Sequence, residues 1–516
     1  MTHLVAPITV DSVSAALQQA GLAQALGASA VEWRVDRLVG EVEQVRKLVA
    51  GCPLPCIVTC RHACETGGFD GPESQRIALY AALASAPKPT MALDVELAKW
   101  REEPEWAKVM GPLLAAGRTK LILSSHDFGG RPGDLAARLA RMLDEPLCHV
   151  PKLAWKAQGL EDCAIAMRLL KASREGGKPG VALAMGEAGM PSRILARKGG
   201  AFMTFAAIDK GRGTAPGQPL LSEMKNLYRW DDIKATTKVY GVIGCPVGHS
   251  MSPAIHNAGF KEVGFDGVYV PMRIEEGYEN FERAVGAWIE SKEMDFCGAS
   301  VTIPHKESLL KWVREKGGNV DATSEMIGAA NTVKVENGKV AALNTDRSGL
   351  FHPVFQRVGN PTGKRVAIIG AGGAARAAIV AFCTSEISVF NRTLARGADL
   401  AGEFSGFNVT ACSMEELASS RFDVLINCTP LGMWPNVDAS PLADNHPAMK
   451  PGVVVFDTVY NPVETKLLRQ AKAAGCECIS GTEMFVLQAA EQFRQWTGQC
   501  APLDIFRQVL AEKLGS

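Results

Sequence analysis

The sequence predicts an α/β protein with two different halves, a (β/α)8 barrel followed by a two-lobed α/β half. Eight short apolar runs alternate with amphipathic helical segments such as Val13–Leu26 over the first part of the chain. Further along, an apolar strand, a glycine-rich turn and an alanine-rich helix follow one another from Lys364 to Ala378. The length of 516 residues leaves room for two or three domains.

The eight runs have the length and composition of buried strands. Active sites of (β/α)8 barrels lie where the carboxyl ends of the strands meet, so polar residues at these ends are candidates for function. The runs are Leu4–Thr9, Ala30–Asp36, Cys56–Arg61, Met91–Glu96, Lys120–His126, Cys148–Ala154, Val181–Gly186 and Phe202–Ala207.

Lys152 interrupts the sixth apolar run, between Pro151 and Leu153. Burial favours the neutral form of an amine, which is the nucleophilic form. The alternative is a lysine that extends its ammonium group to solvent. Other charged side chains lie at matching depths of neighbouring runs, which favours a catalytic lysine. They are Glu32, Arg34, Arg61, Glu65 and His126.

The composition excludes some classes of function. The 55 basic and 55 acidic residues give no net charge, which argues against a nucleic-acid-binding surface, and no apolar run is long enough to span a membrane. Met1–Asp11 lacks a secretory signal, and the fourteen cysteines are typical of a cytoplasmic protein. The plastid stroma stays open as a location if a transit peptide was removed. The cysteine spacing predicts no metal site.

The glycine-rich turn predicts a Rossmann-type dinucleotide site. A strand that ends in glycines at the start of a helix presents backbone N–H groups to a pyrophosphate. The next strand ends in Asn391, Arg392 and Thr393, without the acidic residue that NAD sites usually place there, and Arg392 suits the 2′-phosphate of NADP. The alternative is that Arg392 only caps a loop. The residues expected at the cofactor are Gly370, Ala371, Gly372, Gly373, Ala374, Asn391, Arg392, Thr393, Thr429 and Gly481.

Six motifs in residues 1–222 resemble type I 3-dehydroquinate dehydratases: EWRVD, TCRHACE, SSHD, VPKLA, MGEAGMPSR and TAPGQ. The resemblance implies that Lys152 forms a Schiff base with the substrate ketone. His126 would remove the neighbouring proton and protonate the departing hydroxyl, while Glu65 orients His126. These three are the catalytic residues that the resemblance implies for the barrel.

The same resemblance implies the substrate-binding residues of the barrel. Arg193 would pair with the substrate carboxylate, although a salt bridge on the barrel rim is the alternative for both Arg34 and Arg193. Thr214 stands where the family commonly has serine, and we expect only a packing change there. The implied set is Glu32, Arg34, Arg61 and Arg193, with Thr214 and Gln218 on a closing loop.

The second half resembles shikimate dehydrogenases over about residues 238–516. The motifs are SMSPAIHN, VTIPHK, GAANT, NTD, GAGGAARA, NRT, NCTPLGM, YNP and FVLQAAEQF. The resemblance implies Lys306 and Asp346 as the catalytic pair, with Lys306 moving a proton as hydride passes between NADPH and the substrate. A plain ion pair is the alternative. The implied substrate-binding residues are Ser250, Ser252, Thr302, Asn331, Tyr460 and Gln488.

The predicted division is a barrel in residues 1–222, a short linker in 223–237, and a substrate-binding lobe in 238–346. Residues 482–516 would complete that lobe, and 347–481 would form the Rossmann NADP-binding lobe. The two resemblances imply consecutive steps of the shikimate pathway, from 3-dehydroquinate through 3-dehydroshikimate to shikimate, as in bifunctional fusions of plants. The alternatives are a dehydrogenase half that acts mainly on quinate, and a non-catalytic binding protein on the same folds.

Overall fold

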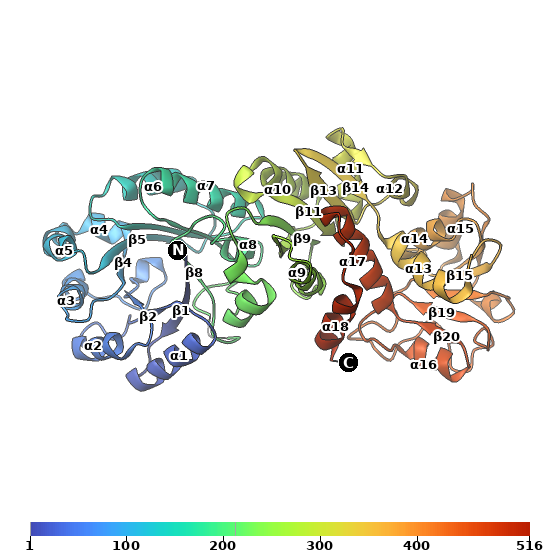
Figure 1. Cartoon of the computed structure of the whole chain (residues 1–516), viewed down its shortest axis with the longest axis horizontal. Coiled ribbons are helices and arrows are strands. Elements are labelled where there is room, and N and C mark those ends of the chain that lie inside the picture. The colour runs from blue at the N-terminus through green and yellow to red at the C-terminus, as the bar shows by residue number, and fades with distance from the viewer. Residues whose placement is uncertain (1, 212, 516) are drawn as a thin grey trace. The chain divides into compact units, whose positions relative to one another are not determined.

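The computed structural model describes residues 2–211 and 213–515, and the chain divides into two compact units (Figure 1). The first unit comprises Met1–His249 and Asp266–Phe296, and the second comprises Ser250–Phe265 and Cys297–Ser516. Among the described residues, no helix combines the length and the apolar character needed to cross a membrane.

Eight parallel strands of the first unit form a nearly closed barrel, which confirms the predicted fold of this half. The strands pair in the order β7-β6-β5-β4-β3-β2-β1-β8. At the seam, the backbone N–H of Phe202 donates to the carbonyl of Gly180 at 2.8 Å, just before β8 and β7 begin. The strands are β1 (His3–Thr9), β2 (Ala30–Arg34), β3 (Cys56–Thr59), β4 (Ala92–Glu96), β5 (Lys120–Asp127), β6 (Val150–Lys156), β7 (Val181–Met185) and β8 (Met203–Phe205).

Helices connect successive strands and lie outside the barrel (Figure 1). In α1, the side chain of Ser12 caps the first turn by accepting a hydrogen bond from the backbone of Ala15 at 3.3 Å. The helices are α1 (Val13–Ala25), α2 (Val42–Gly51), α3 (Glu73–Ala84), α4 (Leu97–Glu102), α5 (Glu105–Ala115), α6 (Leu135–Asp144), α7 (Glu161–Glu175) and α8 (Met190–Ile194), with a 3-10 turn η1 (Ala63–Glu65).

The barrel interior is apolar at one end and charged at the other. Each strand contributes at least one apolar residue near its amino end to a buried cluster, and this leaves the charged residues to the carboxyl ends. The cluster includes Val5, Ala30, Ile57, Ala92, Ile122, Val150, Val181 and Met203.

Residues 223–237, the predicted linker, are packed rather than extended. The segment contains two short helical turns, η2 (Glu223–Leu227) and η3 (Trp230–Asp232). Met224 and Trp230 are buried, and the guanidinium of Arg197 lies 5.4 Å from the centre of a Trp230 ring. The segment therefore packs through a few apolar side chains, although most of its residues are polar.

The first unit continues beyond the barrel with a parallel pair of strands. β9 (Lys238–Gly244) pairs with β10 (Gly267–Arg273), and α10 (Tyr278–Glu290) and η4 (Lys292–Met294) follow. The indole N–H of Trp288 on α10 donates to the carbonyl of Leu160 at 2.9 Å. This buried bond ties α10 to the loop that follows β6.

In the second unit, β13 pairs antiparallel with both β11 and β14, and β12 runs parallel to β14. Asn337 and Gly338, a dipeptide typical of tight hairpin turns, have the positive φ angles of 52° and 75° that such a turn requires. The elements are α9 (Ser252–Glu262), β11 (Phe296–Val301), α11 (Lys306–Glu315), β12 (Asn319–Val320), α12 (Ala322–Ile327), β13 (Thr332–Glu336) and β14 (Lys339–Leu343).

A second sheet of this unit has the Rossmann-type arrangement that the glycine-rich turn predicts. Its six strands are all parallel, in the order β17-β16-β15-β18-β19-β20. The elements are α13 (Asp346–Val358), β15 (Arg365–Ile369), α14 (Gly373–Ala381), β16 (Glu386–Phe390), α15 (Leu394–Glu403), β17 (Val409–Cys412), η5 (Glu415–Ala418), β18 (Val424–Asn427), β19 (Val454–Asp457), α16 (Lys466–Ala473) and β20 (Glu477–Ile479).

The chain ends with helices α17 (Gly481–Thr497) and α18 (Leu503–Leu514), drawn in dark red in Figure 1. The ring centres of Phe493 on α17 and Phe506 on α18 are 5.8 Å apart, and Phe493 also lies against Phe260 of α9. Trp496 donates its indole N–H to the carbonyl of Val333 at 3.1 Å. The apolar residues of α17 are therefore used in core packing.

Replacing Gly259 with alanine should destabilise the second unit. The added methyl group would lie 2.6 Å from Phe506 and 3.0 Å from Phe493, so buried rings would have to move. We expect Gly259→Ala to lower the free energy of unfolding by about 1–3 kcal/mol, measured by denaturant titration. Gly402→Ala is the control, because Gly402 is exposed in α15 with open space around it and should be neutral or slightly stabilising. Equal stabilities of the two variants would contradict the packing.

Candidate functional site

The structure brings all nine residues predicted for the barrel site to one cavity of about 110 Å³ at the carboxyl ends of the strands. They come from β2, β5, β6, α8 and the loops after β3 and β8. The residues are Glu32, Arg34, Arg61, Glu65, His126, Lys152, Arg193, Thr214 and Gln218.

Lys152 is buried inside this cavity. Only 4% of its surface is exposed, so the alternative of a solvent-facing lysine is wrong. Its Nζ atom donates to the carboxylate of Asp94 at 2.9 Å and lies 3.6 Å from Glu32. The ring of Phe205 lies 4.7 Å from Nζ and closes another side. The amine is thus held by carboxylates and an aromatic face, out of contact with bulk water.

His126 and Glu65 form a hydrogen-bonded pair. The Nδ1 atom of His126 lies 2.8 Å from Glu65 Oε2, and the backbone N–H of His126 donates to the same oxygen at 3.1 Å. Burial, together with the nearby cations Arg61 and Lys152, holds the pKa of His126 well below its usual value. Burial raises the pKa of Glu65 to about 7. His126 is therefore neutral at neutral pH, as a general base must be.

A network of buried charges lies under Lys152, and the sequence analysis missed two of its carboxylates. Asp94 and Glu96 both lie on β4 and are fully buried. Arg61 donates to Asp94 at 2.8 Å and to Glu96 at 3.1 Å, and Arg76 donates to Glu96 at 2.5 Å. Burial alone would raise the pKa of Asp94, but Arg61 and Lys152 beside it lower the pKa overall. Two acidic residues inside an otherwise apolar run were the signal for these sites.

The two arginines considered for rim salt bridges differ. Arg34 donates to Asp36 at 2.9 Å and so has the salt bridge of the alternative interpretation. Asp36 also accepts the backbone N–H groups of Arg61 and Gly68 at 2.9 Å each. Arg193 is 2% exposed, and within the described part of the chain its Nε has no hydrogen-bond partner. Burial lowers its pKa to about 10. It is a buried cation that an anionic ligand would stabilise.

The predicted closing loop is held over the cavity by its own hydrogen bonds. Gln218 accepts the backbone N–H of Thr214 at 3.0 Å and donates to the Thr214 hydroxyl at 3.3 Å. Pro216 in the same loop accepts a hydrogen bond from the backbone of Gly186 at 3.1 Å. The loop therefore rests on the segment that connects β7 to α8.

The second predicted catalytic pair is formed in the second unit. Lys306, the first residue of α11, donates to the Asp346 carboxylate at 2.6 Å, and Asp346 begins α13. Asn331 donates to the other oxygen of Asp346 at 2.8 Å. Lys306 keeps 33% of its side chain exposed. This lysine, unlike Lys152, can exchange protons with solvent.

The remaining predicted substrate residues are only partly connected to this pair. Thr345 donates to Asn331 at 3.2 Å and to Gln488 at 3.4 Å, which links Gln488 on α17 to the pair, and Thr345 was not predicted. Ser250 accepts the backbone N–H of Ser252 at 3.3 Å. Tyr460 and Thr302 make contacts away from Lys306. The ring of Tyr460 packs on Phe485, and the backbone carbonyl of Thr302 accepts the backbone N–H of His305.

The glycine-rich turn has the space that a dinucleotide needs. Gly370 has a φ of +111°, and a side chain there would approach Thr429 at 3.0 Å. Side chains at Gly372 and Gly373 would meet nothing within 4 Å, so this side of the turn is open at the start of α14. Exposed backbone N–H groups of a helix start bind phosphate, and the residues present therefore fit the cofactor.

The other predicted cofactor residues follow neighbouring strands. Asn391 uses its side-chain amide to bond the carbonyl of Thr393 at 2.8 Å, which leaves Arg392 exposed between them. Gly481 must be glycine because a side chain would lie 2.4 Å from the carbonyl oxygen of Val459. No group of three or more metal-binding side chains occurs in residues 2–211 and 213–515.

A buried pair that the sequence analysis missed organises the loops after β18 and β19. Asn427 donates to Asp457 at 2.9 Å and accepts the backbone N–H of Thr429 at 3.0 Å. Asp457 in turn accepts the Thr465 hydroxyl at 2.6 Å. Thr429 is therefore positioned by a side-chain network, whose only signal in the sequence was a polar residue at the end of each strand.

Four family descriptions match successive parts of the chain. Type I 3-dehydroquinase matches residues 4–235, and the shikimate dehydrogenase substrate binding domain matches 242–333. Shikimate / quinate 5-dehydrogenase matches 354–447, and the shikimate 5'-dehydrogenase C-terminal domain matches 481–511.

Relatives match either the whole chain or its second half. The bifunctional 3-dehydroquinate dehydratase/shikimate dehydrogenase of Arabidopsis thaliana, described as chloroplastic, is 34% identical over 98% of this chain and 84% of its own length. The NADP+ shikimate dehydrogenase of Moorella thermoacetica is 37% identical over 55% of this chain and 96% of its own length. A solved shikimate dehydrogenase in complex with NADP+ is 34% identical, covers 55% of this chain and 97% of its own, and has a TM-score of 0.51. The chain therefore belongs to the family of bifunctional 3-dehydroquinate dehydratase/shikimate dehydrogenases.

Proposed function

We propose that the barrel cavity and the Lys306–Asp346 pair are the two active sites of this bifunctional enzyme. The protein is a 3-dehydroquinate dehydratase and an NADP-dependent shikimate dehydrogenase of the shikimate pathway. The observation that carries the assignment of the first site is the single cavity that contains Lys152, His126, Glu65 and Arg193.

In the dehydratase site, the Lys152 amine would attack the ketone of 3-dehydroquinate and, with loss of water, form an imine. The protonated imine withdraws electrons and acidifies the adjacent carbon. His126, neutral because of burial, would take the proton from that carbon and return it to the departing hydroxyl. Hydrolysis of the imine would then release 3-dehydroshikimate and restore Lys152. Asp94 would receive the ammonium form of the lysine between turnovers.

The substrate would bind to charged side chains that line the barrel cavity. The buried guanidinium of Arg193 would pair with the substrate carboxylate. Glu32, Arg34 and Arg61 would contact the ring hydroxyls, and Thr214 and Gln218 would close over the substrate. The salt bridge between Arg34 and Asp36 fixes the direction of the Arg34 guanidinium.

In the dehydrogenase site, Lys306 would give a proton to the carbonyl oxygen of 3-dehydroshikimate, and Asp346 would hold Lys306 in place. NADPH supplies the hydride when bound. The turn Gly370–Ala374 would bind the pyrophosphate of NADPH. The 2′-phosphate would be bound by Asn391, Arg392 and Thr393, and the cofactor would also be bordered by Thr429 and Gly481. The substrate would contact Ser250, Ser252, Thr302, Asn331, Tyr460 and Gln488.

The product of the first reaction is the substrate of the second, so the two sites suit consecutive steps. Quinate as the main substrate is not favoured, because the NADP-dependent relatives are named shikimate dehydrogenases. The presence of Lys152, His126, Lys306 and Asp346 in bonded arrangements also argues against a non-catalytic derivative. We infer small-molecule substrates as partners, with no role for nucleic acid or membrane.

Two further inferences stay proposals. The division at residues 222, 237, 346 and 481 assigns the barrel, the linker and the two dehydrogenase lobes, and limited proteolysis followed by mass measurement tests it. A cytoplasmic location, or the plastid stroma, is tested by cell fractionation. The name of the Arabidopsis relative includes chloroplastic, which supports the plastid for that protein.

Removing either lysine should abolish one activity and spare the other. We expect Lys152→Ala to eliminate dehydration and borohydride trapping of substrate on the protein, while reduction of 3-dehydroshikimate stays within about twofold. Lys306→Ala should do the reverse. A coupled assay with 3-dehydroquinate and NADPH, followed by loss of NADPH absorbance, should succeed with the unmodified protein and fail with both variants. Loss of both activities in either variant would contradict two independent sites.

Neutralising Asp94 should weaken both the barrel and the dehydratase. Asp94→Asn leaves Arg61 and Lys152 without their shared carboxylate, and loss of one partner of a buried ion pair costs about 3–5 kcal/mol of stability. Because the pKa of Asp94 is lowered in the fold, this stabilisation is fully present at neutral pH. It should begin to decline as the pH falls below about 4 and continue to decline towards the lower pKa of the folded state.

The measurement is the free energy of unfolding between pH 7 and pH 3 together with dehydratase activity at pH 7. Asp134→Asn is the control, because the ion pair of Asp134 with Arg138 is exposed and should contribute less than about 1 kcal/mol. Equal stabilities of the two variants at pH 7 would show that the buried ion pairs of Asp94 contribute no more to stability than an exposed pair.

Replacing Arg392 should change the cofactor preference. We expect Arg392→Ala to raise KM for NADPH about tenfold or more, since one charge-assisted hydrogen bond contributes roughly 1.5–3 kcal/mol. KM for NADH should stay within about twofold, because NADH has no 2′-phosphate. Arg421→Ala removes an exposed arginine before β18 and is the control. An equal rise in KM for both cofactors would remove Arg392 from the 2′-phosphate site.

A further inference from the structure

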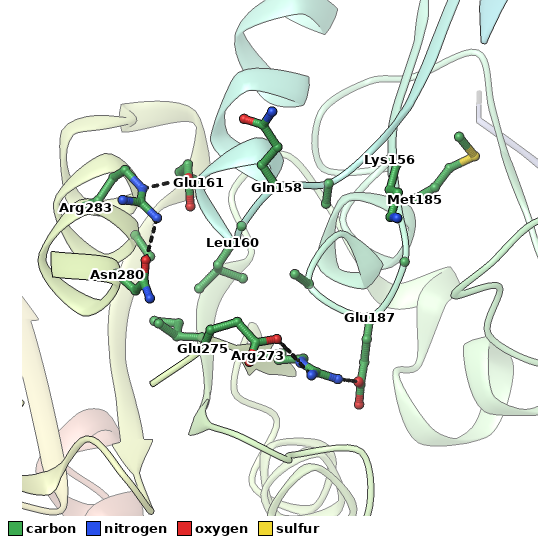
Figure 2. A pocket seen from close by; sticks show the side chains of 16 residues that line it. Lys156, Gln158, Leu160, Glu161, Met185, Glu187, Arg273, Glu275, Asn280 and Arg283 are labelled. Carbon is green, nitrogen blue, oxygen red and sulfur yellow. Dashed lines mark hydrogen bonds and ion pairs between the residues drawn. The ribbon is translucent and has the colours of Figure 1, made fainter. Parts of the chain in front are cut away.

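Figure 2 shows a second cavity of the first unit, which shares a lining residue with the barrel cavity. Its volume is about 210 Å³, and Met185 at the end of β7 lines both cavities. One wall consists of the loops that follow β6 and β7 of the barrel. The other consists of β10 and α10, which lie within residues 242–333, the match to the dehydrogenase substrate binding domain.

Two arginines of the dehydrogenase segment reach across this cavity to barrel glutamates. Arg273, the last residue of β10, donates to Glu187 and, at 2.9 Å, to Glu275. Arg283 on α10 donates to Glu161 at 2.9 Å and to Asn280 at 2.8 Å. Figure 2 shows the two bridges on different sides of the cavity.

The bridge to Glu187 ends on a segment that supports the closing loop of the dehydratase. Glu187 directly follows Gly186, whose backbone N–H donates to Pro216 at 3.1 Å. Gly217 packs so closely on this segment that a side chain on it would lie 2.4 Å from the Gly186 oxygen. A shift of Glu187 would therefore move the support of the residues between Thr214 and Gln218.

The same segment leads into the helix that carries Arg193. Only Ala188 and Gly189 separate Glu187 from α8 (Met190–Ile194). The start of that helix is tied to β7 by Ser192, whose hydroxyl accepts the backbone N–H of Ala184 at 3.0 Å. Within the segment between β7 and α8, Glu187 is held by Arg273, a residue outside the barrel.

We propose that Arg273 is a positioning residue for the dehydration reaction, although it belongs to the dehydrogenase segment of the chain. It fixes Glu187 and with it the connection between β7 and α8, so that the closing loop and Arg193 face the substrate together. This inference rests on the proposed function of the barrel cavity. It means that the dehydrogenase segment completes the dehydratase site without contacting its substrate.

The bridge is suited to a positioning role rather than a stabilising one. The side chains of Arg273 and Glu187 are 31% and 36% exposed, and ion pairs this open to solvent contribute little to stability. Arg273→Ala should therefore fold normally, which thermal unfolding verifies. A change in the dehydratase kinetics would then report on geometry.

The test is steady-state dehydration of 3-dehydroquinate by the full-length protein. We expect Arg273→Ala to lower kcat/KM about tenfold, mainly through a higher KM, because the loop and the carboxylate-binding arginine lose their common support. Arg273→Lys keeps the positive charge and should recover most of the loss. Arg283→Ala removes a similar bridge on the opposite side of the cavity and should leave kcat/KM within about twofold.

A double-mutant cycle identifies the partner. Glu187→Gln should reproduce the defect of Arg273→Ala, and the double variant should be no worse than either single variant, since each removes the same bridge. Additive losses, or an Arg273→Ala enzyme with unchanged KM, would overturn the inference. If the unmodified protein failed to dehydrate 3-dehydroquinate, the proposed function would fail instead, so the two failures are distinguishable.

Discussion

The dehydratase half depends on the pairing of charges inside the barrel. Asp94 and Glu96 are fully buried on one strand, and a buried carboxylate is tolerated only when cations and hydrogen bonds compensate it. Arg61, just after β3, donates to both carboxylates, and Lys152 on β6 donates to Asp94. The Lys152 amine, which we propose as the nucleophile, is therefore one member of a structural network. Its position follows from the carboxylates that surround it. The Nε atom of Arg193, by contrast, has no hydrogen-bond partner among the described residues, which leaves room for an anionic substrate.

In the dehydrogenase half, Lys306 has a more solvent-exposed environment than Lys152 has in the barrel. Lys306 lies at the start of a helix with a third of its side chain exposed, and a hydrogen-bonded amide, Asn331, holds the Asp346 partner. A proton donor must be recharged from solvent after each turnover, whereas an imine-forming lysine gains from exclusion of water. The two lysines proposed as catalytic, Lys152 and Lys306, therefore differ in burial in the direction that their proposed chemistries require.

The parts that could be predicted from sequence are those encoded locally. Strand positions follow from apolar runs, the hairpin from Asn337–Gly338, and the site residues from polar side chains at strand ends. The partner of Lys152 was missed because Asp94 is 58 residues away and pairing depends on which strands the barrel places side by side. The burial of the segment at residues 223–237 was also missed, because scattered apolar residues such as Trp230 show no period in a polar stretch. Pairing between residues far apart in the sequence, and packing without a regular period, could therefore not be predicted from local sequence patterns.

The boundary between the two families differs from the boundary between the compact units. By family description, residues 242–333 belong to the dehydrogenase, yet Asp266–Phe296 groups with the barrel, and buried contacts such as that of Trp288 with Leu160 explain why. A fused chain thus has an option that two separate enzymes lack, since an element of one catalytic half can become part of the scaffold of the other. When that element also bonds the segment next to a closing loop, as Arg273 does, fusion changes the mechanical support of an active site and not only its proximity to the next enzyme.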